Sequence, residues 1–108
     1  MGIAYATGKQ DYDKAIECFE KAIELNDLAE AYFGMGIAYQ YGKQDYKEAI
    51  KYYKKAIKYK PDLAEAYCGM GIAYGKQGKK KQELTYMKRA AIRGFEPAKQ
   101  WLRDNDFT

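Results

Sequence analysis

Apolar residues recur at helical spacing through the middle of the chain. From position 46 they fall at i, i+3, i+4, i+7, i+10 and i+11, namely Tyr46, Ala49, Ile50, Tyr53, Ala56 and Ile57. An α-helix brings these positions to one face because it turns about once every 3.6 residues. The same spacing occurs earlier, at Tyr12, Ala15, Ile16, Phe19, Ala22 and Ile23. The pattern predicts two amphipathic helices, and no segment alternates in the way of a β-strand.

A different apolar stripe precedes the helix predicted over 46–57. It consists of Tyr32, Met35, Gly36 and Tyr39. Asp27 and Glu30, three residues apart, form a capping-box pattern at its start, and Asp62 and Glu65 repeat that pattern one unit later. Since a Gly-Lys-Gln-Asp stretch separates the two stripes, each unit is predicted to be a pair of antiparallel helices, a helical hairpin.

Short strings recur along the chain at a nearly constant interval. MGIAY stands at 1–5, 35–39 and 70–74, so its copies are 34 and 35 residues apart. DLAEAY stands at 27–32 and 62–67, and GKQDY also occurs twice. A period of this length indicates a repeat array, in which each unit buries its apolar face only against its neighbours. Function is then expected on a surface that several units share.

The middle unit carries eight signature positions in register: Tyr32, Met35, Gly36, Tyr39, Ala49, Tyr53, Ala56 and Pro61. In these residues the chain resembles the tetratricopeptide repeat, whose pattern is W-x2-L-G-x2-Y, then A-x3-F, then A and P. Glycine and alanine let helices approach, aromatic residues fill the gaps, and proline ends the second helix. The resemblance implies an all-α fold, a right-handed superhelical array of antiparallel helix hairpins with a C-terminal capping helix.

The last unit departs from the pattern in its second helix. Glu83 stands where a small alanine is usual and Phe95 where proline is usual, so we expect looser packing there. The segment 88–102, with its small residues, also resembles the longer Sel-like repeats, which is the second interpretation of the fold. We expect a single repeat domain over 1–108, made of a partial repeat 1–28, a repeat 29–63, a repeat 64–97 and a capping helix 97–105.

The first unit is incomplete, because Met1 takes the position that Met35 has in the next unit. Apolar surface on this unit is then left uncovered, and burial of a large side chain stabilises by roughly 1.5–3 kcal/mol. We expect self-association, as a dimer, through Met1, Ile3, Tyr5, Ala22 and Ile23. The alternative is a fragment excised from a longer tetratricopeptide scaffold, with no independent function.

Two joints differ in length between the units. The joint at 25–28 is one residue shorter than the joint at 59–63 and lacks its proline. A tight turn is favoured there, with a continuous helix that permits domain swapping as the alternative. The hairpin turn at 40–44 is one residue longer than the turn at 75–78, and we expect a local bulge.

Composition argues against catalysis. The chain has no histidine, and Cys18 and Cys68 stand fifty residues apart without a C-x-x-C arrangement. Two thiols make no disulfide framework, and there is neither a signal-peptide core nor a run of 18 apolar residues. We therefore expect a cytoplasmic, non-enzymatic protein without metal or cofactor, in which both cysteines are structural.

The family resemblance implies where a ligand would bind, because the first helices of such arrays line a concave groove for a peptide or partner helix. On that face lie Phe33, Ile37, Gln40, Tyr41, Cys68, Ile72 and Lys76. This mostly apolar set suits a hydrophobic segment or an amphipathic helix. The alternative is that Phe33 and Ile37 pack on neighbouring helices. Gly34 and Gly69 would let another backbone come close on this side.

Charge is distributed unevenly and adds an alternative partner. Residues 1–34 hold 3 Lys and 7 Asp or Glu, whereas residues 35–108 hold 16 Lys or Arg and 8 acidic residues. Lysines gather on one helix and one turn, at Lys47, Lys51, Lys54, Lys55, Lys58, Lys60, Lys76, Lys79, Lys80 and Lys81. Such a surface allows a basic-surface binder of acidic partners or nucleic acid. Nucleic acid is the less expected of the two, because most tyrosines fall at core positions and are unavailable for stacking.

Overall fold

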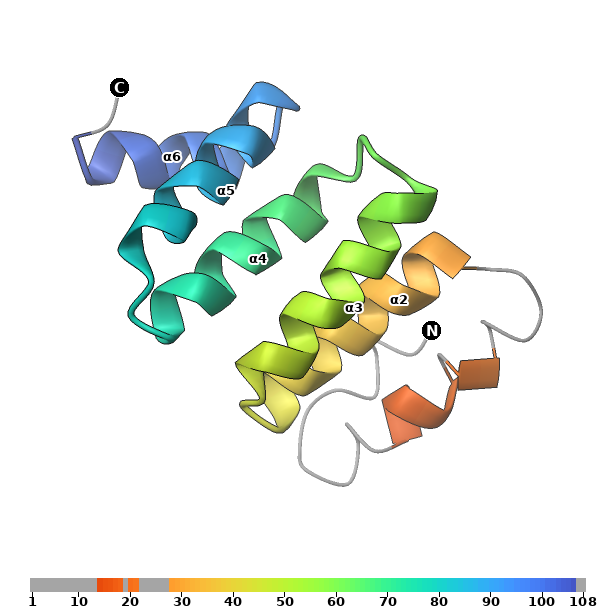
Figure 1. The fold of residues 1–108 in the computed structure, drawn as a ribbon. Coiled ribbons are helices and arrows are strands. Elements are labelled where there is room, and N and C mark those ends of the chain that lie inside the picture. Colours follow the sequence, from red (N-terminus) through yellow and green to blue (C-terminus); the bar gives the residue numbers. More distant parts are fainter. Residues whose placement is uncertain (1–13, 19, 22–27, 107–108) are drawn as a thin grey trace.

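The fold is an all-α array of helices that follow one another along a row (Figure 1). The computed structural model describes residues 14–18, 20–21 and 28–106. Residues 14–18 and 20–21 are helical. The later elements are α2 (Leu28–Ile37), the π-helix η2 (Ala38–Gly42), α3 (Tyr46–Tyr59), α4 (Ala64–Lys76), α5 (Lys80–Ile92) and α6 (Glu96–Asp104). The described ranges contain no strand, which confirms the predicted helical solenoid.

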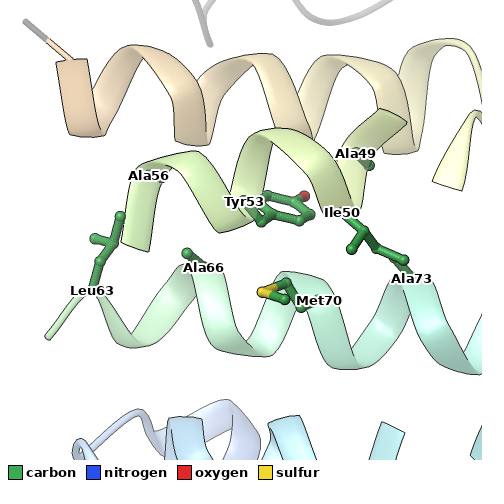
Figure 2. Packing of buried hydrophobic residues seen from close by; sticks show 8 residues of the cluster. All are labelled: Ala49, Ile50, Tyr53, Ala56, Leu63, Ala66, Met70 and Ala73. Atoms are coloured by element: carbon green, nitrogen blue, oxygen red, sulfur yellow. The ribbon is translucent and has the colours of Figure 1, made fainter. Parts of the chain in front are cut away.

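The central core lies between α3 and α4, where large side chains face small ones (Figure 2). Its buried members are Ala49, Ile50, Tyr53, Ala56, Leu63, Ala66, Met70 and Ala73. The four alanines are completely buried, and their small volume lets the helix backbones approach closely. A core of this kind holds neighbouring helices together, as repeat arrays require.

Tyr53 fills the space that two glycines leave open. Its side chain is 1% exposed, and a Cβ atom added at Gly36 would lie 2.5 Å from its Cε1 atom. A Cβ atom added at Gly69 would lie 2.7 Å from its Cζ atom. Both distances are far below van der Waals contact. The Tyr53 ring therefore fills the space beside Gly69. This space is not free for an incoming backbone, contrary to the expectation from the sequence.

The proline at the end of the middle unit organises the next joint through its carbonyl oxygen. The Pro61 oxygen accepts a hydrogen bond from the Tyr67 hydroxyl at 3.1 Å and another from Arg93 Nε at 3.1 Å. The Arg93 guanidinium also lies 4.1 Å from the centre of the Tyr67 ring, within range of a cation–π interaction. The turn between α3 and α4 is thus tied to α4 and to the end of α5.

The second helix of the last unit is not packed loosely. Met87 is 1% exposed and Ala90 is completely buried. The carboxylate of Glu83 occupies the space where a Cβ atom of Gly75 would stand. Glu83 is larger than the alanine of the pattern, and the absence of a side chain at Gly75 leaves room for it. The prediction of loose packing was wrong because Gly75, on the opposite helix, leaves room for Glu83.

The longer hairpin turn of the middle unit is a π-helix. The amide of Lys43 donates to the carbonyl of Ala38, five residues earlier, at 3.3 Å. After the π-helix, the amide of Asp45 donates to the carbonyl of Tyr39, six residues earlier, at 2.9 Å. A π-helix closes i→i+5 hydrogen bonds, so one turn accommodates one more residue than an α-helical turn. The extra residue predicted to form a bulge lies in this segment.

Helix caps differ from those that the capping-box pattern predicted. The side chain of Asp45 accepts a hydrogen bond from the amide of Glu48 at 3.1 Å and caps α3. Before α4 the cap position belongs to Leu63, and no side chain bonds to the free amides; the box predicted from Asp62 is therefore not formed. Asp27 and the joint at 25–28 before Leu28 lie outside the described residues. No helix in the described ranges is long and apolar enough to span a membrane.

Candidate functional site

A hollow of about 280 Å³ is formed mainly by the first helix of each hairpin. Its walls consist of Phe33, Ile37, Tyr41, Tyr53, Glu65, Cys68, Gly69, Ile72, Phe95 and Pro97. These residues belong to α2, η2, α3, α4 and the start of α6. We call this hollow the groove. Apolar and aromatic side chains make up nearly all of its wall, and Glu65 supplies its carboxylate.

The structure brings together five of the seven residues that the sequence placed on the groove face: Phe33, Ile37, Tyr41, Cys68 and Ile72. Phe33 and Ile37 also pack against the core between α3 and α4. The ring of Phe33 lies 5.8 Å from that of Tyr53, centre to centre. Both residues remain partly exposed. The two interpretations of Phe33 and Ile37, packing and lining, are therefore compatible.

Gln40 lies inside the protein and not on the wall of the groove. It is 2% exposed, and its Oε1 atom accepts a hydrogen bond from the Tyr53 hydroxyl at 2.6 Å. Within the described part of the chain, its Nε2 atom has no hydrogen-bond partner. Gln40 belongs to η2, where the wider turn directs side chains differently from the α-helix that the sequence led us to assume. The prediction that Gln40 lines the groove was therefore wrong.

Lys76 does not line the groove either. It is the last residue of α4 and is exposed. Ile72, one turn earlier, is the last residue of α4 that contributes to the wall. The groove thus ends before the turn to α5, and Lys76 lies beyond it.

The predicted groove set did not include five residues of the wall, of which Glu65 was assigned to a capping box. Tyr53 was assigned to the core, and Gly69 was considered only as a place for close approach. Phe95 and Pro97 come from the start of α6, because the first helix of the next unit closes the groove at this end. The signal that identifies them is the continuation of the repeat after α5, in which α6 takes the place of α2 and α4.

Burial controls the ionisation of the two titratable groups at the base of the groove. Desolvation raises the pKa of the Cys68 thiol to about 11, so that the neutral form prevails at neutral pH. The Cys68 sulfur donates toward the Met87 thioether at 3.9 Å. Burial also raises the pKa of Tyr53, the tyrosine that donates to Gln40. The groove thus offers apolar contacts and no ionised nucleophile at this position.

The described residues include no group of three or more potential metal ligands close together. Of the residues predicted to mediate self-association, Met1, Ile3, Tyr5, Ala22 and Ile23 all lie outside the described residues. In the neighbouring helical segment, Ala15 is completely buried and Cys18 is exposed.

Comparison with known proteins identifies the repeat. The sequence profile of the TPR repeat matches residues 7–40 and 41–78. The chain belongs to the tetratricopeptide repeat (TPR) family. This assignment agrees with the packing of Gly36, Tyr53, Ala49 and Ala56, which occupy signature positions of the repeat.

The solved structures that resemble this TPR chain include several of MamA. A crystal structure of MamA superimposes with a TM-score of 0.70 at 29% sequence identity, over 87% of this chain and 63% of the MamA chain. A single-substitution mutant of MamA gives a TM-score of 0.71 at 25% identity, over 85% of this chain and 66% of that chain. A further MamA structure gives 0.68 at 29% identity, over 87% and 58%.

The TPR chain is shorter than these structural relatives, since it spans 58% to 66% of their length. None of the curated proteins matches it significantly. The similarity to MamA therefore concerns the TPR array itself.

Proposed function

We propose that this TPR chain is a non-catalytic protein-interaction module whose groove binds a hydrophobic segment or an amphipathic helix of a partner protein. Proteins of the TPR family generally act as scaffolds, and the fold supports protein partners. The groove is the surface proposed to receive the partner. The expected occupant is a partner helix with apolar side chains at i, i+3 or i+4 and i+7, because this spacing puts them on one face of that helix.

The observation that supports this proposal most directly is the composition of the groove wall. Side chains from α2, α4 and the start of α6 converge on one hollow, and apolar groups predominate among them. Phe33, Ile37 and Ile72 remain partly exposed although each also packs against a core cluster. Contiguous exposed apolar surface of this kind marks interaction sites in soluble proteins.

Peptide selection followed by affinity measurement tests the proposal. Peptides are selected from a phage-displayed library on the wild-type chain, and the binding of one labelled peptide is measured by fluorescence anisotropy. We expect Ile72→Glu and Ile37→Glu to weaken binding by about tenfold or more, because a carboxylate would replace apolar contact. Circular dichroism establishes that each variant remains helical.

Ile92→Glu is the matched control. Ile92 has the same side chain but is 82% exposed on α5 and does not contribute to the groove. Its substitution should leave peptide affinity unchanged. Equal weakening by Ile92→Glu and Ile72→Glu, or the absence of any selected peptide with helical apolar spacing, would contradict the proposal.

We also infer self-association through the first unit, at Met1, Ile3, Tyr5, Ala22 and Ile23. Support comes from the apolar character of these residues. Analytical ultracentrifugation at tens of micromolar should give a dimer mass, and Ile3→Asp should shift it toward monomer. A strict monomer for the wild-type chain contradicts this inference, and favours the alternative of a piece of a longer TPR scaffold.

A further inference from the structure

A second hollow, of about 660 Å³, lies between α3 and the end of α4. Five lysines, one isoleucine, one tyrosine and one glutamine form it: Lys47, Lys51, Lys54, Lys55, Lys79, Ile50, Tyr74 and Gln77. We call it the lysine hollow. None of these residues lines the groove. Its volume is within the range of pockets that bind small molecules.

The sequence of α3 places four of these lysines around the same hollow. Lys47, Lys51 and Lys54 are four and three residues apart, so they lie on neighbouring positions of one helix face. Lys79, the N-cap residue of α5, adds a fifth ammonium group from another element. Like charges at such spacing repel each other. A bound anion would relieve this repulsion.

Among the described residues, few acidic groups are close enough to offset the charge. The described residues that line the lysine hollow include no carboxylate. Lys51 forms an ion pair with Glu48 at 3.9 Å, with both side chains substantially exposed, and pairs of this kind contribute little. The hollow therefore has an excess of positive charge.

The floor of the lysine hollow is apolar, which strengthens electrostatic attraction. Ile50 is buried, and Tyr74 is partly buried. The Lys79 ammonium lies 5.9 Å from the centre of the Tyr74 ring. Charges above a low-dielectric wall focus the field and raise the local concentration of a counter-ion.

The density of charge favours a compact phosphate chain over an acidic peptide. In an extended peptide, side chains on one face are about 7 Å apart, and each carboxylate carries a single charge. A chain of three phosphates carries roughly four negative charges in a smaller space, and each phosphate offers several acceptor oxygens. Lysine acts as a point charge with freely rotating donors, as in other phosphate sites, whereas arginine is favoured for planar bidentate contacts.

We propose that the lysine hollow is a binding site for a compact polyphosphate, either an inorganic chain or the triphosphate of a nucleotide. The ammonium groups of Lys47, Lys51, Lys54, Lys55 and Lys79 hold the phosphate oxygens. The apolar floor formed by Ile50 and Tyr74 carries this cluster of charges. This site is independent of the groove and of the function proposed for it.

Isothermal titration calorimetry with sodium tripolyphosphate tests the site. We expect saturable binding of one ligand per chain at about 50 mM NaCl, and weaker binding at about 150 mM, since salt screens the contacts. The triple variant Lys47→Gln, Lys51→Gln, Lys54→Gln should lose about tenfold or more in affinity. Circular dichroism shows whether its helices are retained, and removal of like charges should not weaken them.

A second triple variant with the same change in net charge is the control. Lys58→Gln, Lys60→Gln and Lys88→Gln affect exposed lysines outside the lysine hollow, and affinity for tripolyphosphate should change less than about twofold. Equal loss in the two variants would show that only overall charge matters and would overturn the site. Undetectable binding by the wild-type chain would overturn it as well.

Two further ligands distinguish the source of the phosphate and the class of ligand. ATP that binds more tightly than tripolyphosphate assigns the site to a nucleotide, and ATP that binds equally or more weakly assigns it to an inorganic chain. A hexaglutamate peptide that binds more tightly than tripolyphosphate contradicts the proposal and makes an acidic protein segment the ligand. Ile72→Glu, which alters the groove, should leave tripolyphosphate binding intact.

Discussion

Replacement of Gly36 by alanine should destabilise the protein, although alanine is the better helix former. The added Cβ atom would lie 2.5 Å from Cε1 and 2.6 Å from Cδ1 of Tyr53, where carbon atoms prefer a separation of about 3.5–4.0 Å. The ring cannot move away easily, because it also lies close to Gly69 and because Gln40 accepts its hydroxyl hydrogen bond.

Two opposing terms set the size of the effect. Overpacking of a tight core costs about 1–3 kcal/mol, and the confined Tyr53 ring places this site at the upper end. The gain in helix propensity from glycine to alanine is roughly 1 kcal/mol. We expect Gly36→Ala to lower the free energy of unfolding by about 2 kcal/mol, the difference between these terms.

Urea denaturation followed by circular dichroism measures this difference, provided that the slope of the transition is unchanged. The same substitution is then made in the Tyr53→Leu background, where the ring is absent. There the propensity term alone should remain, so that Gly36→Ala stabilises by about 0.5–1 kcal/mol. A reversal of sign between the two backgrounds is the expected result. Stabilisation by Gly36→Ala in the wild-type background would refute the reasoning.

Two other predictions concern the cap of α3 and the thiol in the groove. Asp45→Ala removes the acceptor for the Glu48 amide and should cost about 1 kcal/mol in urea denaturation, whereas Asp45→Asn, which keeps an acceptor, should cost much less. In a Cys18→Ser variant, labelling of Cys68 by a disulfide reagent should accelerate about tenfold per pH unit up to a pH near its pKa of about 11; a plateau below pH 9 would contradict this. This pKa is raised above the ordinary 9.0. Relative to a Cys68→Ala variant, the stability that Cys68 contributes should therefore be complete below pH 9 and be lost as the pH rises toward 11.

The architecture followed from the sequence because the repeat period and the helical spacing act together. The positions of Gly36, Ala49 and Ala56 could be assigned before the helices were seen, since a strict 3.6-residue pattern leaves one face for the core. Ile37 and Ile72 could be assigned to one surface for a related reason. They occupy the same position in the repeated MGIAY string, so that each repeats the other's orientation.

The details that were missed depend on contacts between helices or on local changes of helix type. The turn that directs Gln40 inward is one residue longer, but its length alone does not show that the residue is absorbed in a π-helix. Glu83 was considered by itself, whereas its accommodation depends on Gly75 across the hairpin. The Asp45 cap could have been found, because Asp45 and Glu48 have the spacing of a capping box. The predicted capping boxes lay only before the first helix of each unit.

The compensation between Gly75 and Glu83 limits how segments can be exchanged between the units. In the middle unit the corresponding positions hold the larger Gln40 and the smaller Ala49, so the two pairs have opposite size order. Recombination within MGIAY would transfer both members of a pair together, because both lie after that string. Recombination within the Gly-Lys-Gln stretch of the hairpin turn would join Gln40 to Glu83 and crowd the interface. Exchange through MGIAY therefore keeps each matched pair together, whereas exchange through the turn separates its members.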